Sequence, residues 1–168
     1  LSLVARTPDF DNRSVLHAIL SDWQLSPIIR WQSGNRSSVT TGVDNALTGL
    51  GGQRAVQILD DPYGSGAPLQ YLNRAAFTTP ATGTYSTLAP FTIVNPSSFQ
   101  NDFALTRTFP FGGAQSVQFR WEVFNVINHV NFNAPITALN SASFGQIQST
   151  VPVGGDPRIM QFALKFTF

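Results

Sequence analysis

The sequence predicts an all-β fold: an antiparallel up-and-down meander of about five strands, part of a larger transmembrane β-barrel, with two long loops. The clearest signal lies in residues 158–168, where apolar and polar side chains alternate strictly. Charged residues make up only 11% of the chain, against about a quarter in a typical soluble domain. Shorter and longer connections also alternate between the candidate strands, as they do in outer-membrane barrels.

The C-terminal segment has one face that is apolar throughout. This face carries Met160, Phe162, Leu164, Phe166 and Phe168. Successive strand side chains point to opposite faces of a sheet, so strict alternation is a strand signal. In an outer-membrane barrel, one face of the wall meets lipid and the other lines a wet lumen. The segment is therefore predicted to be a membrane-spanning strand.

Four further strands are predicted at residues 1–6, 22–33, about 99–109 and 116–126. Pro27 is awkward in the second strand because it has no N–H to donate, which implies a bulge or a locally unpaired position. In the third strand, Arg107 interrupts the apolar side. The fourth strand alternates well, with apolar Val117, Phe119, Trp121 and Val123 against polar Gln118, Arg120 and Glu122.

The connections place the strands in a barrel topology. Residues 110–115 form a tight hairpin signal, and residues 7–21 form the other shorter link, where Asn12 or Ser14 could cap a helical turn. The long loops are about 34–98 and about 128–156. With a periplasmic C-terminus, both long loops fall outside the cell and both shorter links fall inside, as the family of outer-membrane barrels requires.

The chain is expected to be one partial domain, residues 1–168, because about eight strands are needed to close a barrel. It starts without Met, a basic n-region or an apolar h-region. We therefore expect it to be a C-terminal segment of a longer protein.

Composition and motifs argue against several functions. The net charge of +1 gives no basic field for nucleic acid, and the absence of cysteine excludes disulfides and thiol chemistry. The two histidines, His17 and His129, form no zinc-binding pair, no Gly-x-Ser-x-Gly occurs, and residues 49–52 lack the lysine of a phosphate loop. We therefore expect no catalytic, cofactor-binding or metal-binding residues, and no enzyme.

The long loop holds weaker candidates. A calcium site that includes Asp44 lacks any EF-hand spacing, and Asp60 and Asp61 before Pro62 more often start a turn. Its aromatic residues could bind carbohydrate, although such side chains more often pack a large loop onto itself. These residues are Tyr63, Tyr71, Tyr85 and Phe91.

The alternation assigns side chains to the two faces of the wall. The predicted lumen-facing residues are Gln118, Arg120, Glu122, Gln161 and Lys165. The predicted lipid-facing residues include Trp121, Phe162, Leu164 and Phe166, and the terminal Phe168 could belong to an interfacial aromatic girdle. Arg120 and Glu122 could contact a substrate or a plug, but we favour an ion network that keeps charge away from lipid.

Several segments resemble the C-terminal end of TonB-dependent outer-membrane receptors, and most closely the Oar-like, carboxypeptidase-regulatory-like receptors of Acidobacteria. The more specific matches are Gln118-Phe-Arg-Trp-Glu-Val-Phe-Asn-Val-Ile-Asn-His129 and Asp156-Pro-Arg-Ile-Met-Gln-Phe-Ala-Leu-Lys-Phe166. Further matches lie at residues 21–28, 31–34, 40–44, 72–77, 131–132 and 143–147, so the resemblance spans nearly the whole chain.

The resemblance implies a bacterial outer-membrane protein whose barrel has roughly twenty-two strands and a plugged lumen. It implies ligand uptake driven by the TonB complex, without a cofactor, and recognition of the terminal aromatic strand by the barrel-assembly machinery. The expected partners are thus outer-membrane lipid, the rest of the barrel and its plug, and these two machineries. Two alternatives remain: a fragment that self-assembles by strand addition through open edges, and a soluble carbohydrate-binding β-sandwich.

Overall fold

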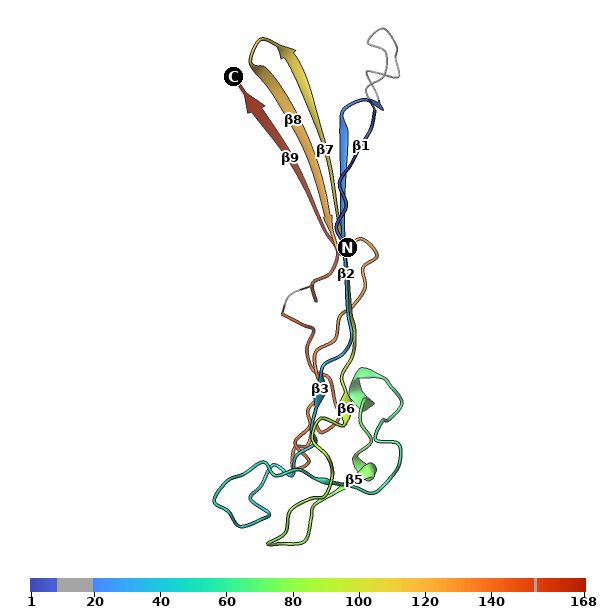
Figure 1. Ribbon diagram of the computed structural model, residues 1–168, viewed down its shortest axis with the longest axis vertical. Helices are drawn as coiled ribbons and strands as arrows, with labels where there is room; N and C mark the ends of the chain where they lie inside the picture. The colour runs from blue at the N-terminus through green and yellow to red at the C-terminus, as the bar shows by residue number, and fades with distance from the viewer. Residues whose placement is uncertain (9–19, 153) are drawn as a thin grey trace. The chain divides into compact units, whose positions relative to one another are not determined.

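A computed structural model describes residues 1–8, 20–152 and 154–168, which form two compact units (Figure 1). The first unit comprises Leu1–Trp31, Phe99–Val130 and Pro152–Phe168, and the second comprises Gln32–Ser98 and Asn131–Val151. The helical turn predicted after Asn12 or Ser14 lies outside the described residues. Within the described part of the chain, no helix is long and apolar enough to cross a membrane.

Strands dominate the secondary structure, as predicted. The elements in chain order are β1 (Ala5–Arg6), β2 (Trp23–Gln32), β3 (Arg36–Ser37), β4 (Val56–Gln57), the 3-10 helices η1 (Pro68–Gln70) and η2 (Arg74–Ala76), β5 (Phe77–Thr78), β6 (Ile93–Val94), β7 (Ser98–Gly112), β8 (Gln115–Phe124) and β9 (Ile159–Thr167). The five-stranded sheet has the order β1-β2-β7-β8-β9, which confirms the antiparallel meander (Figure 1).

The register between strands keeps like side chains together. Along β7 and β8, Leu105 lies opposite Trp121 and Thr106 lies opposite Arg120. The turn between these strands carries a register shift between Pro110 and Gly112. Gly112 and Gly113 have φ values of 113° and 62°, a region that glycine enters without steric cost. The predicted hairpin is therefore confirmed, with β7 extending beyond its expected end into the turn.

Pro27 is tolerated in β2 because the ladder with residues 1–6 lacks one main-chain hydrogen bond at this position. Ser2 lies opposite Ile28 and Ala5 lies opposite Leu25, so the register with residues 1–6 does not change across Pro27. Its carbonyl accepts a hydrogen bond from the N–H of Leu3 at 3.2 Å, but the proline ring has no N–H to return. Of the two outcomes expected at Pro27, the structure shows a locally unpaired position.

The second unit has a hydrophobic core of its own, which strand patterns did not predict. Its buried residues come from both long connections and from widely separated positions within them: Val39, Ala55, Leu72, Ala76, Phe77, Ile93, Leu139 and Phe144. Two short antiparallel ladders, β3 with β6 and β4 with β5, support this core. The residues predicted as two separate loops therefore fold together.

Main-chain hydrogen bonds join the two connections within this unit. The N–H of Leu139 donates to the carbonyl of Thr40 at 2.8 Å, and the N–H groups of Tyr71 and Leu72 both donate to the carbonyl of Gly145. Gly145 has a φ of 79°, and a Cβ there would lie 2.5 Å from the carbonyl oxygen of Leu72. Glycine is therefore required where the second connection contacts the first.

We predict that this hydrophobic core makes the main contribution to the stability of the second unit. Ile93 is fully buried, so Ile93→Ala should lower the free energy of unfolding of this unit by about 2–5 kcal/mol. Leu69 is 70% exposed, so Leu69→Ala should change it by no more than about 0.5 kcal/mol. Native-state hydrogen exchange of the full chain in detergent would measure both, and equal effects would contradict a packed core.

Candidate functional site

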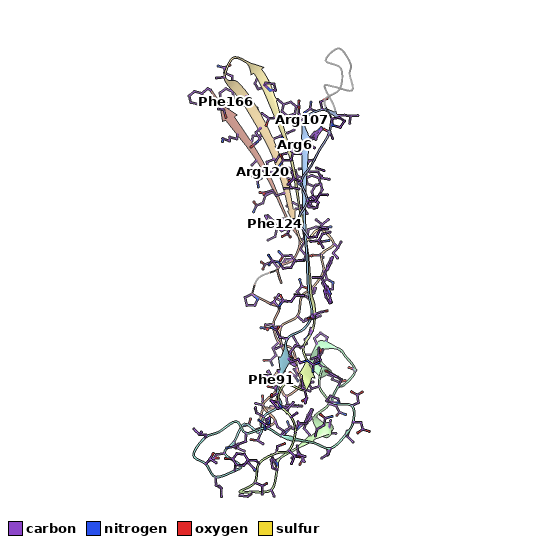
Figure 2. All side chains as sticks on the ribbon, viewed as in Figure 1. Arg6, Phe91, Arg107, Arg120, Phe124 and Phe166 are labelled. Atoms are coloured by element: carbon purple, nitrogen blue, oxygen red, sulfur yellow. The ribbon has the colours of Figure 1, made fainter. Side chains whose placement is uncertain are left out.

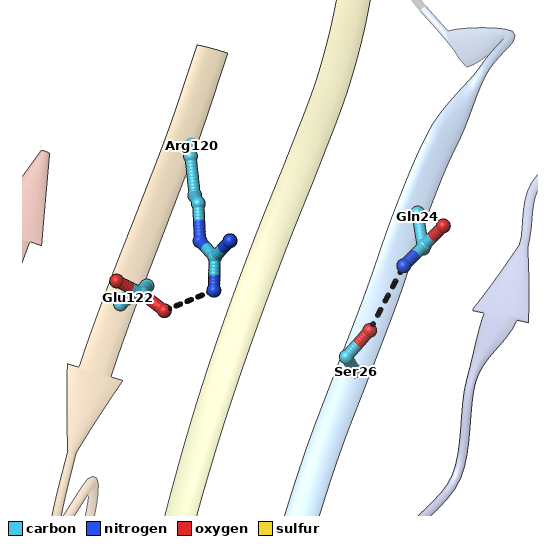
Figure 3. A network of polar contacts seen from close by, with 4 residues as sticks. All are labelled: Gln24, Ser26, Arg120 and Glu122. Atoms are coloured by element: carbon cyan, nitrogen blue, oxygen red, sulfur yellow. Dashed lines mark hydrogen bonds and ion pairs between the residues drawn. The ribbon is translucent and has the colours of Figure 1, made fainter. Parts of the chain in front are cut away.

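The polar face of the sheet gathers the side chains that were predicted to face a lumen. On β8 and β9, Gln118 lies opposite Lys165, and Glu122 lies opposite Gln161. Arg120 shares this face and its guanidinium lies 2.6 Å from the carboxylate of Glu122 (Figure 3). The side chain of Arg120 is 50% exposed, so the pair contributes less than about 1 kcal/mol to stability. Its main effect is to balance charge locally.

This polar face continues across the neighbouring strands. Arg6 donates to the side chain of Gln24 at 3.3 Å. Gln24 in turn donates to Ser26 on the same strand, as Figure 3 shows. Arg6, Gln24, Thr106, Thr108 and Gln118 line one hollow of about 460 Å³. The polar side chains of β2, β7 and β8 therefore form a continuous surface that hydrated solutes or another polar protein surface can contact.

The opposite face is apolar and rich in aromatic rings. Trp121 stacks on Phe162 with ring centroids 6.0 Å apart, and Trp23 meets Phe119 edge-on at 6.3 Å. Leu164 and Phe166 continue this face on β9, with 75% and 56% of their surfaces exposed. Phe168 follows β9, its ring lies 5.9 Å from that of Phe166, and it is 90% exposed. The structure thus separates the two predicted sets of residues, although the medium that each face meets stays a prediction.

Arg107 is the charged exception on the apolar face. Its guanidinium carbon lies 5.4 Å from the ring centroid of Trp23 and 4.6 Å from that of Phe109, and the residue is only 7% exposed (Figure 2). A guanidinium over an aromatic face gains roughly 0.5–2 kcal/mol, more when it is desolvated. The interruption seen in the sequence is therefore accommodated by rings from two strands.

The first unit also contains a hydrogen-bonded turn, residues 125–129, directly after β8. We call it the Asn125 turn. The Asn125 side-chain amide donates to the carbonyls of His129 and Asp156, both at 2.9 Å, and its oxygen accepts the N–H of His129. The Asn125 N–H donates to the carboxylate of Asp102 at 3.0 Å. One buried asparagine therefore connects the turn to β7 and to the segment before β9.

Arg158 completes the link to β9. Its N–H donates to the side chain of Asn128 at 3.0 Å, and its guanidinium donates to the carbonyl of Val126 at 3.4 Å. Asn125 and Asn128 have φ values of 51° and 56°, which asparagine tolerates better than most residues. The two sequence phrases on which the family resemblance mainly rests thus meet in one turn. Strand patterns alone did not predict this site.

The four aromatic residues of the long connection that could bind carbohydrate divide into two groups. Tyr63 and Tyr71 pack edge-to-face at 5.8 Å, and the Tyr71 hydroxyl donates to the carbonyl of Val94 at 2.8 Å. Burial, and secondarily Tyr63, raise the pKa of Tyr71. These two tyrosines therefore pack the segment onto itself. Tyr85 and Phe91 remain 68% and 60% exposed, and Phe91 has a φ of 58°, an uncommon conformation for an aromatic residue.

The acidic residues of this connection organise turns. The carboxylate of Asp44 accepts hydrogen bonds from the N–H groups of Thr48 and Gly49 and from the side chain of Gln53. The Thr48 bond, followed by that of Gln53, holds the pKa of Asp44 below its usual value. Asp61 accepts the N–H of Tyr63 at 2.9 Å, which confirms a turn there.

The structure describes one of the two histidines, His129. The His129 ring meets Phe99 edge-on at 6.2 Å, and its main chain belongs to the Asn125 turn. His17 lies outside the described residues. Among residues 1–8, 20–152 and 154–168, no group of three or more His, Cys, Asp or Glu side chains is placed to hold a metal ion.

Comparison with known protein families matches residues 1–161 to the family described as outer membrane beta barrel domain. Neither a curated protein nor a solved structure gives a significant match. The family match covers the first sequence phrase of the Asn125 turn in full and the second as far as Gln161, so it includes only the start of β9.

We predict that the Asn125 side chain stabilises the first unit. Asn125→Ala should lower its free energy of unfolding by about 2–4 kcal/mol, because two carbonyls lose their donor and alanine is strained at positive φ. Asn125→Gly relieves the strain but not the lost bonds, so it should be less harmful than alanine and still destabilising. Equilibrium unfolding of the full chain from detergent would measure both variants. Wild-type stability of Asn125→Gly would show that the side chain contributes nothing.

Proposed function

Because the chain belongs to the outer membrane β-barrel domain family, we propose that it supplies the last strands of a TonB-dependent receptor, a barrel that takes up a ligand and catalyses no reaction. The family places the protein in the bacterial outer membrane. One observation supports most directly the proposal that the sheet is part of the wall of a membrane barrel. Of the hydrophobic side chains buried in the described residues, only Val123 belongs to the first unit, so its sheet has almost no core of its own.

A sheet of this kind needs apolar surroundings and further strands. Its outward apolar side chains, such as Phe162 and Leu164, are suited to contact with hydrocarbon. β1 and β9 stand at the two edges of the sheet, where each leaves one side of its backbone without a strand partner among the described residues. About eight strands are the practical minimum for closure, so we propose that other strands of the same receptor pair with these edges.

The proposed topology follows from the sheet. Thr167 at the end of β9 lies opposite Ser116 at the start of β8, so the terminus and the β7–β8 hairpin share one end. Arg107 near this hairpin contacts Trp23 at the start of β2, so the start of β2 belongs to the same end. We assign this end to the periplasm and the two long connections to the cell exterior, as in barrels with short inner turns.

The proposed type of receptor is inferred from the residues that resemble the receptor family. The phrases that resemble Oar-like, carboxypeptidase-regulatory-like receptors include Asn125, Asn128, His129, Asp156 and Arg158, and the structure gives each a defined contact in the Asn125 turn. We propose that the polar face of the sheet contacts a plug. The TonB complex then acts through the rest of the receptor, and Phe168 helps the barrel-assembly machinery to engage β9. The open edges of β1 and β9 also favour a second candidate, assembly of copies by strand addition.

The first test concerns the lipid-facing side chains. In the full-length receptor, Leu164→Arg should lower stability in lipid by about 2–4 kcal/mol, because a charge near the middle of the membrane loses its hydration. Gln161→Arg on the polar face of the same strand is the matched control, and it should cost much less because it also lies opposite Glu122. Unfolding from lipid vesicles would measure both. An equal loss of stability in the two variants would contradict the assignment of one face to lipid and the other to the lumen.

The second test concerns topology and uses the absence of cysteine from the chain. Ser65 in the long connection and Ala114 in the hairpin are both exposed in the structure. On intact cells that display the full-length receptor, Ser65→Cys should react with a membrane-impermeant maleimide and Ala114→Cys should not. Both should react once the outer membrane is opened. Reaction at Ala114→Cys alone in intact cells would show that the proposed topology is reversed. An assembly of copies that forms without lipid would instead favour strand addition as the function.

A further inference from the structure

The second unit contains a pocket that no sequence pattern indicated. Its volume is about 400 Å³, within the range of roughly 300–1,000 Å³ that is typical of small-ligand sites. Its walls come from three separate parts of the chain, around Thr41, between Arg74 and Thr79, and at Leu139 and Asn140. A site built from both long connections exists only because these connections fold together.

The floor of the pocket is firmly held. Thr41, Phe77 and Leu139 are 1%, 6% and 7% exposed, and Phe77 packs against Phe144 with ring centroids 5.8 Å apart. The N–H of Thr41 donates to the carbonyl of Gln53 at 2.7 Å. A ligand that enters the pocket therefore meets a surface that is already formed, which reduces the entropic cost of binding.

Of the described residues that line this pocket, Arg74 alone has an ionisable side chain. One guanidinium nitrogen donates to the carbonyl of Ser141 at 3.2 Å, and the guanidinium carbon lies 5.9 Å from the ring centroid of Phe144. These two contacts fix the side chain at the rim but use only part of its five N–H donors. Within the described residues, the structure gives the guanidinium no carboxylate partner within 4.0 Å. Arg74 therefore keeps both its charge and donors for an incoming anion.

The remaining rim offers groups that bind hydroxyls. Thr78, Thr79 and Asn140 are exposed, and each has hydrogen-bonding capacity in its side chain. The Asn140 amide donates to the carbonyl of Gly42 at 3.1 Å, and a Cβ at Gly42 would lie 1.9 Å from the Asn140 side-chain oxygen. The close approach at Gly42 thus positions an amide at the edge of the pocket.

We propose that this pocket binds a small hydroxylated organic acid. The carboxylate pairs with the guanidinium of Arg74, since that planar fork matches carboxylate geometry, and the hydroxyls contact Thr78, Thr79 and Asn140. The apolar edge of the molecule lies against Phe77 and Leu139. The role of the pocket as a place of ligand capture at the cell surface rests on the proposed receptor function, whereas the binding itself does not.

The experiment compares two probes that differ only in their acid group, galacturonate and galactose. Each is titrated into the full chain in detergent, and binding is followed by isothermal titration and by the chemical shifts of pocket residues. We expect galacturonate to bind at least about tenfold more tightly than galactose, because the charge-assisted bonds form only with the acid. Arg74→Gln should abolish this preference, and Arg74→Lys should retain part of it.

Arg54→Gln is the matched control. Arg54 belongs to the same unit, donates its Nε to the carbonyl of Leu88 at 2.9 Å and does not line the pocket, so its loss should leave the preference for acid unchanged. A thermal melt of each variant checks folding. Equal binding of the two probes, or an acid preference that survives in Arg74→Gln, would overturn the proposal. If binding depends on Arg74 but Ser65→Cys stays unlabelled on intact cells, the pocket is retained and the receptor topology is rejected. If Ser65→Cys is labelled but binding does not depend on Arg74, only the pocket is rejected.

Discussion

The register of β8 against its two neighbours is the constraint on which the described sheet depends. Along both ladders, the large apolar side chains lie opposite other apolar ones, as Trp121 does between Leu105 and Phe162, with the exception of Phe119, which lies opposite Arg107 on β7. Because side chains alternate with a period of two, a slip of one residue would move every one of them to the other face. Arg120 and Glu122 would then stand among the exposed aromatic rings. The separation of a polar and an apolar surface therefore requires a single pairing.

Features at both ends of β8 favour that pairing. At one end, Gly112 and Gly113 allow a turn whose positive φ values other residues resist. At the other end, Asn125 bonds to Asp102 on β7 and to Asp156 before β9, so it connects the three strands that carry the ladders. A slipped register would separate these partners and leave buried polar groups without hydrogen bonds, which costs about 1–3 kcal/mol for each group.

Local periodicity accounts for what the sequence predicted well. Alternation over residues 116–126 and 158–168 involves neighbouring side chains only, so it predicted which side chains share a face and the approximate bounds of β8 and β9. The hairpin was also a local signal. The extension of β7 to Gly112 was missed because pairing continues past Pro110 through a register shift, which a pattern of alternating residues does not show.

Long-range contacts account for what strand patterns missed. The core residues Val39, Ile93 and Leu139 lie far apart in the chain and follow no common period, so nothing local marks them as neighbours. The ladders beside them have only two residues on each strand, too short for alternation to show. The Asn125 turn joins residues 23 and 31 positions apart, and only the resemblance drew attention to its two phrases. Arg107 interrupts the apolar pattern of its strand in the sequence, but its partner Trp23 comes from another strand.

The two units are thus stabilised in different ways. The second unit buries its own apolar side chains, as any water-soluble fold does, and its exposed Arg74, Thr78 and Thr79 suit an aqueous setting. The sheet of the first unit leaves Phe162 and Leu164 mostly uncovered, with 68% and 75% exposed, and this is unfavourable in water. In the proposed barrel wall, lipid would remove this cost, because in hydrocarbon an apolar face no longer needs a protein partner. Agents that strip lipid should therefore weaken the sheet while leaving the core around Ile93 intact, a difference that follows from where each unit finds its apolar contacts.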